Sequence, residues 1–240
     1  MMLRLSRRLR TVDNEAGLGL VEILVASLLG LLLMTAVGAA FINTIKVTNF
    51  TMQNRSSTQT AANAMQEIIE VVHLATPIAV QGQVANTPAV VFGGRTDLQI
   101  YSLVDVADPV NPAPSRVTFD IQNGNLVDTR CGATSTNGFW TFSTCASNSK
   151  RTIAGTFVPP TGTQNYLFTY LDATGNVLPL TGSGTACAGY APPCLPAASL
   201  PLVGSIIASV NLLAPGATNG PAYLQSKTGM PNVGVQTEIN

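Results

Sequence analysis

The chain has 240 residues, with twelve basic and twelve acidic side chains, so its net charge is zero. Charged residues make up only 10% of it, against about 25% in a typical soluble protein. The basic side chains beyond residue 10 are scattered along the sequence, which excludes the basic patch of a nucleic-acid-binding protein, and we expect no nucleic-acid partner.

Residues 17–42 (GLGLVEILVASLLGLLLMTAVGAAFI) form an apolar stretch with a single charged residue, Glu22. Its uncharged part, Ile23 to Ile42, has 20 residues, enough for a helix to cross the roughly 30 Å hydrocarbon core of a bilayer. Four arginines precede it within the first ten residues, and basic residues beside a membrane helix stay in the cytoplasm. We therefore predict a single-pass helix with its N-terminus inside and the rest of the chain exported.

Two other interpretations of this stretch are a cleavable secretory signal and a plain signal anchor. A secretory signal has an apolar region of about 7–15 residues followed by small residues, and Ala36 to Ala40 loosely offers such a cleavage site. Those small residues lie inside the apolar run rather than after it, however, and the run is longer than the apolar region of a secretory signal. A plain anchor gives Glu22 no role, although an acid inside a membrane helix costs roughly 2.5–3.5 kcal/mol.

This N-terminus resembles that of type IV prepilins and type II secretion pseudopilins. Their signature is a short basic leader that ends in glycine, an apolar first mature residue and a glutamate at mature position five, which Gly17, Leu18 and Glu22 match. The resemblance implies that prepilin peptidase cuts after Gly17 and methylates the new amino terminus of Leu18. This chain has Leu18 and Gly19 where the family most often has Phe followed by Thr or Ser.

Glu22 is the predicted assembly residue. Methylation leaves the amine of Leu18 positively charged, and in an assembly of such helices this amine can pair with the Glu22 carboxylate of a neighbour. The partners that the resemblance implies are prepilin peptidase, other pilin or pseudopilin subunits, the inner-membrane assembly platform and membrane lipid.

The helix is expected to continue beyond the apolar stretch. Asn43 to His73 contains neither Pro nor Gly, and Ala61, Ala64, Ile68 and Val72 recur at helical spacing before Pro77 ends the pattern. The polar segment 46–60 should be its least stable part. The predicted division is a cytoplasmic leader (1–17), a membrane-spanning and assembly helix (18–42), a helical extension (43–76) and an exported β-rich head (77–240).

The head contains several strand patterns separated by turn residues. The strongest is a hairpin, in which Asn123-Gly124 joins residues 117–121 to 126–130. The other predicted strand segments are 166–171 and 177–178, which flank a turn at 172–176, then 205–213 and 233–239. We predict an α+β fold, with the long N-terminal helix packed on a mainly antiparallel β-sheet head.

Four cysteines, Cys131, Cys145, Cys187 and Cys194, lie in the predicted exported part and suit disulfides in an oxidising compartment. They allow three pairings. We favour Cys131 with Cys145 and Cys187 with Cys194, because each pair encloses a short, turn-rich loop. A zinc site is the alternative, but no C-x-x-C occurs and the single histidine, His73, is distant.

We expect no enzymatic activity, no cofactor and no metal. The sequence lacks G-x-S-x-G, H-E-x-x-H and P-loop motifs. His73 is expected to end the helix, where a cation interacts favourably with the last carbonyls. Asp172 and Asn176 could suggest calcium, but a hairpin turn explains both. Asp105 and Asp108 are expected to be solvated in a proline-rich loop.

The sequence therefore predicts a structural subunit, a minor pilin of a type IV pilus-like filament. The pattern F-x-Y-x-D-x-x-G at Phe168 to Gly175, followed by later strands, is also loosely similar to minor pilins of the W type and pseudopilins of the J type. A type II secretion pseudopilin is the first alternative. A membrane-anchored adhesin or binding module, for which the helix is only a tether, is the second.

Overall fold

The computed structural model describes residues 19–83, 86–104, 112–142, 145, 149–158, 166–187, 189–213 and 220–233. Within them the long helix α1 (Leu20–His73) is followed by strands and short 3₁₀ helices. The chain divides into two compact units, one ending at Asn49 and one beginning at Phe50. The second unit contains the end of α1 and the whole β-rich head.

The strands form two antiparallel sheets, so the predicted α+β fold is confirmed. In the first sheet the order is β1-β2-β3-β4-β5, and β6 pairs with β4 as well. The second sheet has the order β7-β8-β9. The strands are β1 (Val90–Gly93), β2 (Leu98–Ser102), β3 (Ser115–Gln122), β4 (Asn125–Thr136), β5 (Phe139–Phe142), β6 (Lys150–Thr156), β7 (Phe168–Leu171), β8 (Ser205–Leu212) and β9 (Ala222–Gly229).

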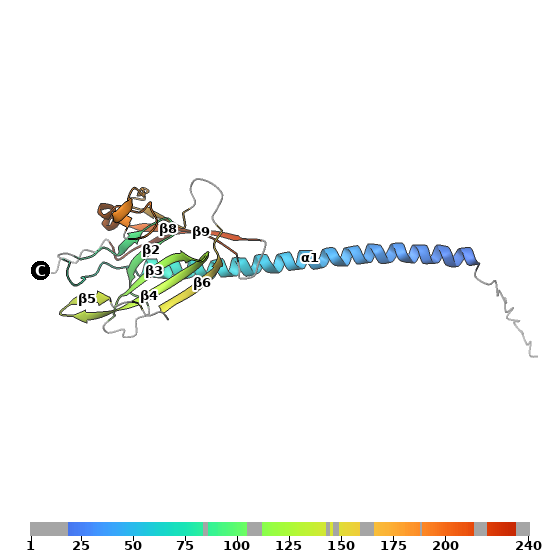
Figure 1. Ribbon diagram of the computed structural model, residues 1–240, viewed down its shortest axis with the longest axis horizontal. Coiled ribbons are helices and arrows are strands. Elements are labelled where there is room, and N and C mark those ends of the chain that lie inside the picture. The colour runs from blue at the N-terminus through green and yellow to red at the C-terminus, as the bar shows by residue number, and fades with distance from the viewer. Residues whose placement is uncertain are drawn as a thin grey trace, which may run out of the picture. The chain divides into compact units, whose positions relative to one another are not determined.

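The end of α1 supplies one side of the core of the second unit. Its buried face, which includes Ala61, Ala64 and Ile68, has the helical spacing expected from the sequence. Figure 1 shows β3, β4 and β6 lying over this part of α1. The side chains that fill the core from the sheets are Leu98, Ile100, Val117, Phe119, Leu126, Phe168, Tyr170, Ile206, Val210 and Leu212.

The helix ends where β2 meets it. The buried Ser102 hydroxyl donates to the carbonyl of Val71 at 2.8 Å, and the Leu103 N–H donates to the carbonyl of Leu74 at 3.0 Å. These bonds satisfy carbonyls that a helix C-terminus leaves free. The last helical residue, His73, is exposed, and Pro77 follows after the helix has ended. The segment 46–60, expected to be the weakest, is helical throughout.

The β3–β4 hairpin confirms the strongest turn prediction. Gln122 pairs with Asn125, and Asn123 and Gly124 between them have φ angles of 51° and 78°. Two consecutive positive φ angles give a type I′ turn, whose twist suits antiparallel strands.

The second predicted turn also forms, and residues 177–178 lie beside β7 as predicted. The Asp172 N–H donates to the carbonyl of Asn176 at 2.9 Å, and Leu171 makes a single bridge with Val177. The main partner of β7 is β8, which the sequence predicted as residues 205–213. Of the predicted closing strand 233–239, only Val233 is among the described residues. Asp105 and Asp108 also lie outside the described residues.

Candidate functional site

The first thirty residues of α1 carry an exposed apolar surface. Every described residue from Gly19 to Met52 is exposed, including Leu20 at 80% and Met34 at 76%. An 18-residue window within α1 has a mean hydropathy of 2.4 and no buried residue. At about 1.5 Å per residue, residues 20–49 extend about 45 Å, more than the roughly 30 Å hydrocarbon core. This segment is long and apolar enough to form a single-pass membrane anchor, a property it shares with signal sequences.

Hydroxyl groups within the apolar segment are satisfied by the helix itself. Ser27 and Thr35 donate to carbonyls three residues earlier, and Thr44 and Thr48 donate to carbonyls four residues earlier, all at 2.8–2.9 Å. In hydrocarbon an unpaired polar group costs several kcal/mol, so these bonds make the segment compatible with lipid.

Glu22 lies in the first turn of α1 and is exposed. Its N–H donates to the carbonyl of Gly19 at 2.8 Å, which places the start of the helix directly after that glycine. It is the single charged residue of the sequence between Leu20 and Ile45. A carboxylate in a first turn is stabilised by the helix dipole, typically by about 0.3–1 kcal/mol. Gly17 and Leu18, the predicted processing residues, lie outside the described residues.

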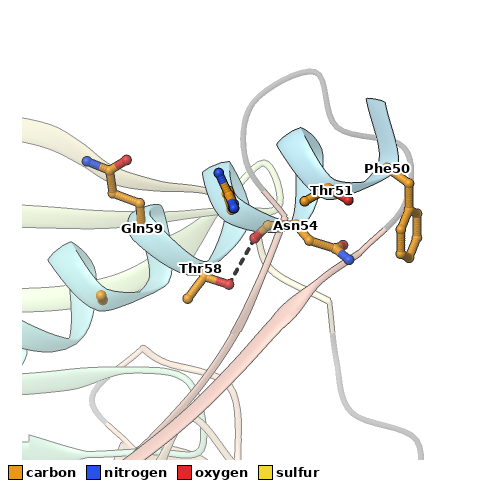
Figure 2. Close-up of a pocket in the computed structure, with 7 residues that line it drawn as sticks. Phe50, Thr51, Asn54, Thr58 and Gln59 are labelled. Atoms are coloured by element: carbon orange, nitrogen blue, oxygen red, sulfur yellow. Dashed lines mark hydrogen bonds between the residues drawn. The ribbon is translucent and has the colours of Figure 1, made fainter. Parts of the chain in front are cut away.

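A shallow hollow of about 420 Å³ lies beside the beginning of the second unit, on α1 between Phe50 and Ala62 (Figure 2). The Thr58 hydroxyl donates to the carbonyl of Asn54 at 2.9 Å. Gly220, with a φ of 81°, lies so close to the Asn54 side chain that a Cβ there would overlap it. The hollow is open, and the residues that line it come from a single helix.

Both favoured disulfides are present. Cys131 on β4 pairs with Cys145, with the Cα atoms 5.0 Å apart, and Cys187 pairs with Cys194 at 5.6 Å. These separations fall within the range that a disulfide allows. All four cysteines of the chain are therefore paired.

An ion cluster that the sequence did not reveal joins α1 to the sheet. It consists of Glu67 on α1, Asp128 and Arg130 on β4 and Arg151 on β6. Arg130 bonds Glu67, and Arg151 bonds Glu67 at 2.6 Å. Asp128, whose side chain is 1% exposed, accepts from Arg130 Nε at 2.9 Å and from Arg151 at 3.0 Å.

The ion cluster is structural in character. The hydrogen bond to Asp128 is the largest cause that raises the pKa of Arg151, and the bond to Glu67 adds to it. The two cations and two anions of the ion cluster balance one another in formal charge. The alternation of Asp128 and Arg130 along one strand was a signal in the sequence, because residues two apart share a face of a sheet.

The turn at Asp172 matches the hairpin interpretation rather than a calcium site. Its Oδ1 atom accepts from the Thr174 hydroxyl at 2.7 Å and from the Asn176 N–H at 2.8 Å. These bonds, the Thr174 hydroxyl first, lower the pKa of Asp172 to about 2. The carboxylate is therefore occupied by its own turn. Among the described residues, no three His, Cys, Asp or Glu side chains gather as metal ligands.

The chain matches no known protein-family model, and no curated protein is significantly similar to it in sequence.

Proposed function

We propose that the chain is a minor pilin, a structural subunit of a type IV pilus-like filament that prepilin peptidase processes after Gly17. The observation that carries the proposal is the apolar surface of residues 20–49, which has a single acid, Glu22, in its first turn. An apolar surface of this length requires either lipid or other helices to cover it. A filament subunit uses both coverings in turn, first lipid and then the helices of its neighbours.

Processing would give Glu22 a partner. Cleavage leaves an amine on Leu18, four residues before Glu22, and methylation of that amine keeps its positive charge. A lone charge in hydrocarbon costs roughly 2.5–3.5 kcal/mol on insertion scales, whereas an amine and a carboxylate from adjacent subunits neutralise one another. The pair would favour the single axial register in which the two groups meet.

The disulfides support export of the head. Structural disulfides persist in oxidising compartments such as the bacterial periplasm and are rare in the cytosol. The four arginines ahead of the apolar segment favour a cytoplasmic location for the N-terminus. Together they support an inner-membrane intermediate with the leader inside and the head outside.

Intact mass and N-terminal sequencing test the processing step. The protein is isolated from membranes of cells with and without an active prepilin peptidase. We expect a mature chain that begins at Leu18 and is heavier by one methyl group, and the full-length chain when the peptidase is absent. A chain cut near Ala40, or one that keeps its leader in both strains, would overturn the proposal.

Replacement of Glu22 tests assembly separately from processing. Glu22→Ala should leave cleavage intact and abolish incorporation into sheared surface filaments. Glu70→Ala is the matched control, because it removes an exposed acid from the same helix within the head unit. If the helix is merely a tether for an adhesin, Glu22→Ala and Glu70→Ala behave alike.

A type II secretion pseudopilin would share the N-terminal chemistry. A deletion strain separates the two machines, because loss of a minor pilin reduces surface pili whereas loss of a pseudopilin blocks secretion of folded exoproteins. We expect loss of pili with normal secretion.

A further inference from the structure

A polar pocket of about 370 Å³ lies on the first sheet of the head, away from the ion cluster. Its lining includes Gln99 on β2, Arg116, Thr118 and Asp120 on β3, Lys150 on β6, and Tyr190. The pocket contains two cations, one carboxylate, amides and hydroxyls. Such a lining differs from the apolar one that most small-molecule pockets have.

The strand register creates this face. On β3 the residues Val117 and Phe119 are fully buried in the core, so Arg116, Thr118 and Asp120 point to the opposite side of the sheet. Thr118 lies opposite Gln99 on β2 and opposite Thr129 on β4. The Gln99 amide donates to the Thr118 hydroxyl at 3.1 Å, which fixes the floor of the pocket.

Each disulfide holds one wall of the pocket. Cys145, which is bonded to Cys131 on β4, lines the pocket beside Arg116, with its Sγ atom 3.9 Å from Arg116 Nη2. Tyr190 lies inside the loop that the Cys187–Cys194 disulfide closes. Its ring stacks on Phe92 with the centroids 4.2 Å apart. Burial raises the pKa of Tyr190, and the nearby Asp120 carboxylate raises it further, so the phenol keeps its proton.

Two buried polar atoms at the pocket have no hydrogen-bond partner among the described residues. They are Arg116 Nε, a donor, and Asp120 Oδ1, an acceptor. The other groups of the same side chains are engaged, because Asp120 Oδ2 accepts from Gln122 at 2.7 Å and the Arg116 guanidinium lies 5.5 Å from the Phe142 ring centroid. Both atoms are fully covered, so a ligand in the pocket meets the other polar groups of the lining rather than these two.

We propose that this pocket binds an acidic saccharide, a sugar unit that carries a carboxylate. Sugar hydroxyls both donate and accept, so they suit a lining that offers hydroxyls, amides and a carboxylate together. The carboxylate matches the two cations, Arg116 and Lys150, which outnumber the single acid. A metal ion is disfavoured by the same two cations, and an apolar ligand would bury the polar floor unpaired. Every lining residue belongs to the head, so the inference does not rest on the proposed filament role of the helix.

The direct test is calorimetric titration of the purified full chain in nanodiscs. The probes are oligogalacturonate and a neutral malto-oligosaccharide of equal length. We expect oligogalacturonate to bind about tenfold or more tightly than the neutral sugar, because a charge-assisted hydrogen bond is about twice as strong as a neutral one. No heat with oligogalacturonate at millimolar concentration, or equal affinity for both sugars, would overturn the proposal.

Variants localise the binding. Arg116→Gln should weaken oligogalacturonate binding about tenfold or more, since it removes the donor fork from the pocket. Arg95→Gln is the matched control, because Arg95 lies 4.9 Å from the Tyr166 ring centroid and outside the pocket, and its affinity should equal that of the wild type. Lys150→Gln changes an exposed side chain and serves if Arg116→Gln does not fold. Unchanged affinity in a folded Arg116→Gln or Lys150→Gln variant contradicts the site.

Discussion

Replacement of Asp128 by asparagine should markedly weaken the packing of the sheet on α1. Asparagine has nearly the same size as aspartate but lacks the charge. Asp128 is 1% exposed and accepts charge-assisted hydrogen bonds from Arg130 and Arg151, both of which also bond Glu67. The substitution therefore changes the charge balance of the ion cluster from zero to plus one without opening a cavity.

The expected cost follows from the burial of each member. Loss of one partner from a fully buried pair costs about 3–5 kcal/mol, because the remaining charge stays in a medium of low dielectric constant. Here the side chains of Arg130 and Arg151 are 20% and 55% exposed, and Glu67 still compensates them. We expect Asp128→Asn to reduce the free energy of unfolding by about 3 kcal/mol, at the lower end of that range. Arg151→Gln removes a largely exposed partner and should cost at most about 1 kcal/mol.

Urea unfolding of the full chain in detergent measures both values. Trp140, the single tryptophan, lies on β5 of the same sheet and reports the transition by fluorescence. The order of the two costs is the critical result. If Asp128→Asn costs less than about 1 kcal/mol, or if Arg151→Gln costs as much, burial of Asp128 does not control the strength of the ion cluster.

Three further predictions concern the core and the turns of the head. Ile68→Ala, at a position 1% exposed, should lower the free energy of unfolding by about 2–5 kcal/mol in the same assay, whereas Leu28→Ala in the exposed segment should leave the unfolding of the head unchanged. Gly124→Ala should cost about 1–2 kcal/mol, because φ is 78° there, and an unchanged urea midpoint would contradict the type I′ turn. The Asp172 carboxyl group should titrate with a pKa of about 2, measured by carbon NMR, rather than at 3.8. Because the pKa is lowered in the folded state, the ionised carboxylate stabilises the turn fully above about pH 4, and this stabilisation is lost as the pH falls toward 2.

Local chemistry allowed several features to be predicted from the sequence. A helix from the apolar segment to His73 follows from uninterrupted helical residues, and the break before Pro77 follows from the geometry of proline. The Asn123-Gly124 hairpin and both disulfides join residues that are near one another in the chain, where short loops close at little entropic cost. Glu22 stands out because a single acid in an apolar helix is visible without coordinates.

Features that combine distant segments could not be predicted in this way. The sequence placed 177–178 beside β7, and the structure confirms this through the Leu171–Val177 bridge. The longer partner of β7 is β8, more than thirty residues later, which the sequence did not place there. The ion cluster joins Glu67 to Arg151 across 84 positions, and these two residues look like scattered surface charges until the register of β4 and β6 is known.

The polar pocket shows the same division between sequence and tertiary structure. The alternation of Arg116, Thr118 and Asp120 marks one face of a strand, which the sequence alone indicates. That Gln99 and Tyr190 meet this face depends on strand pairing and on the loop that the Cys187–Cys194 disulfide closes. The sequence alone determined the helix, its apolar surface and the local turns, because neighbouring residues fix them. Only tertiary structure decided which polar groups are buried together, because that depends on the register of strands from distant parts of the chain.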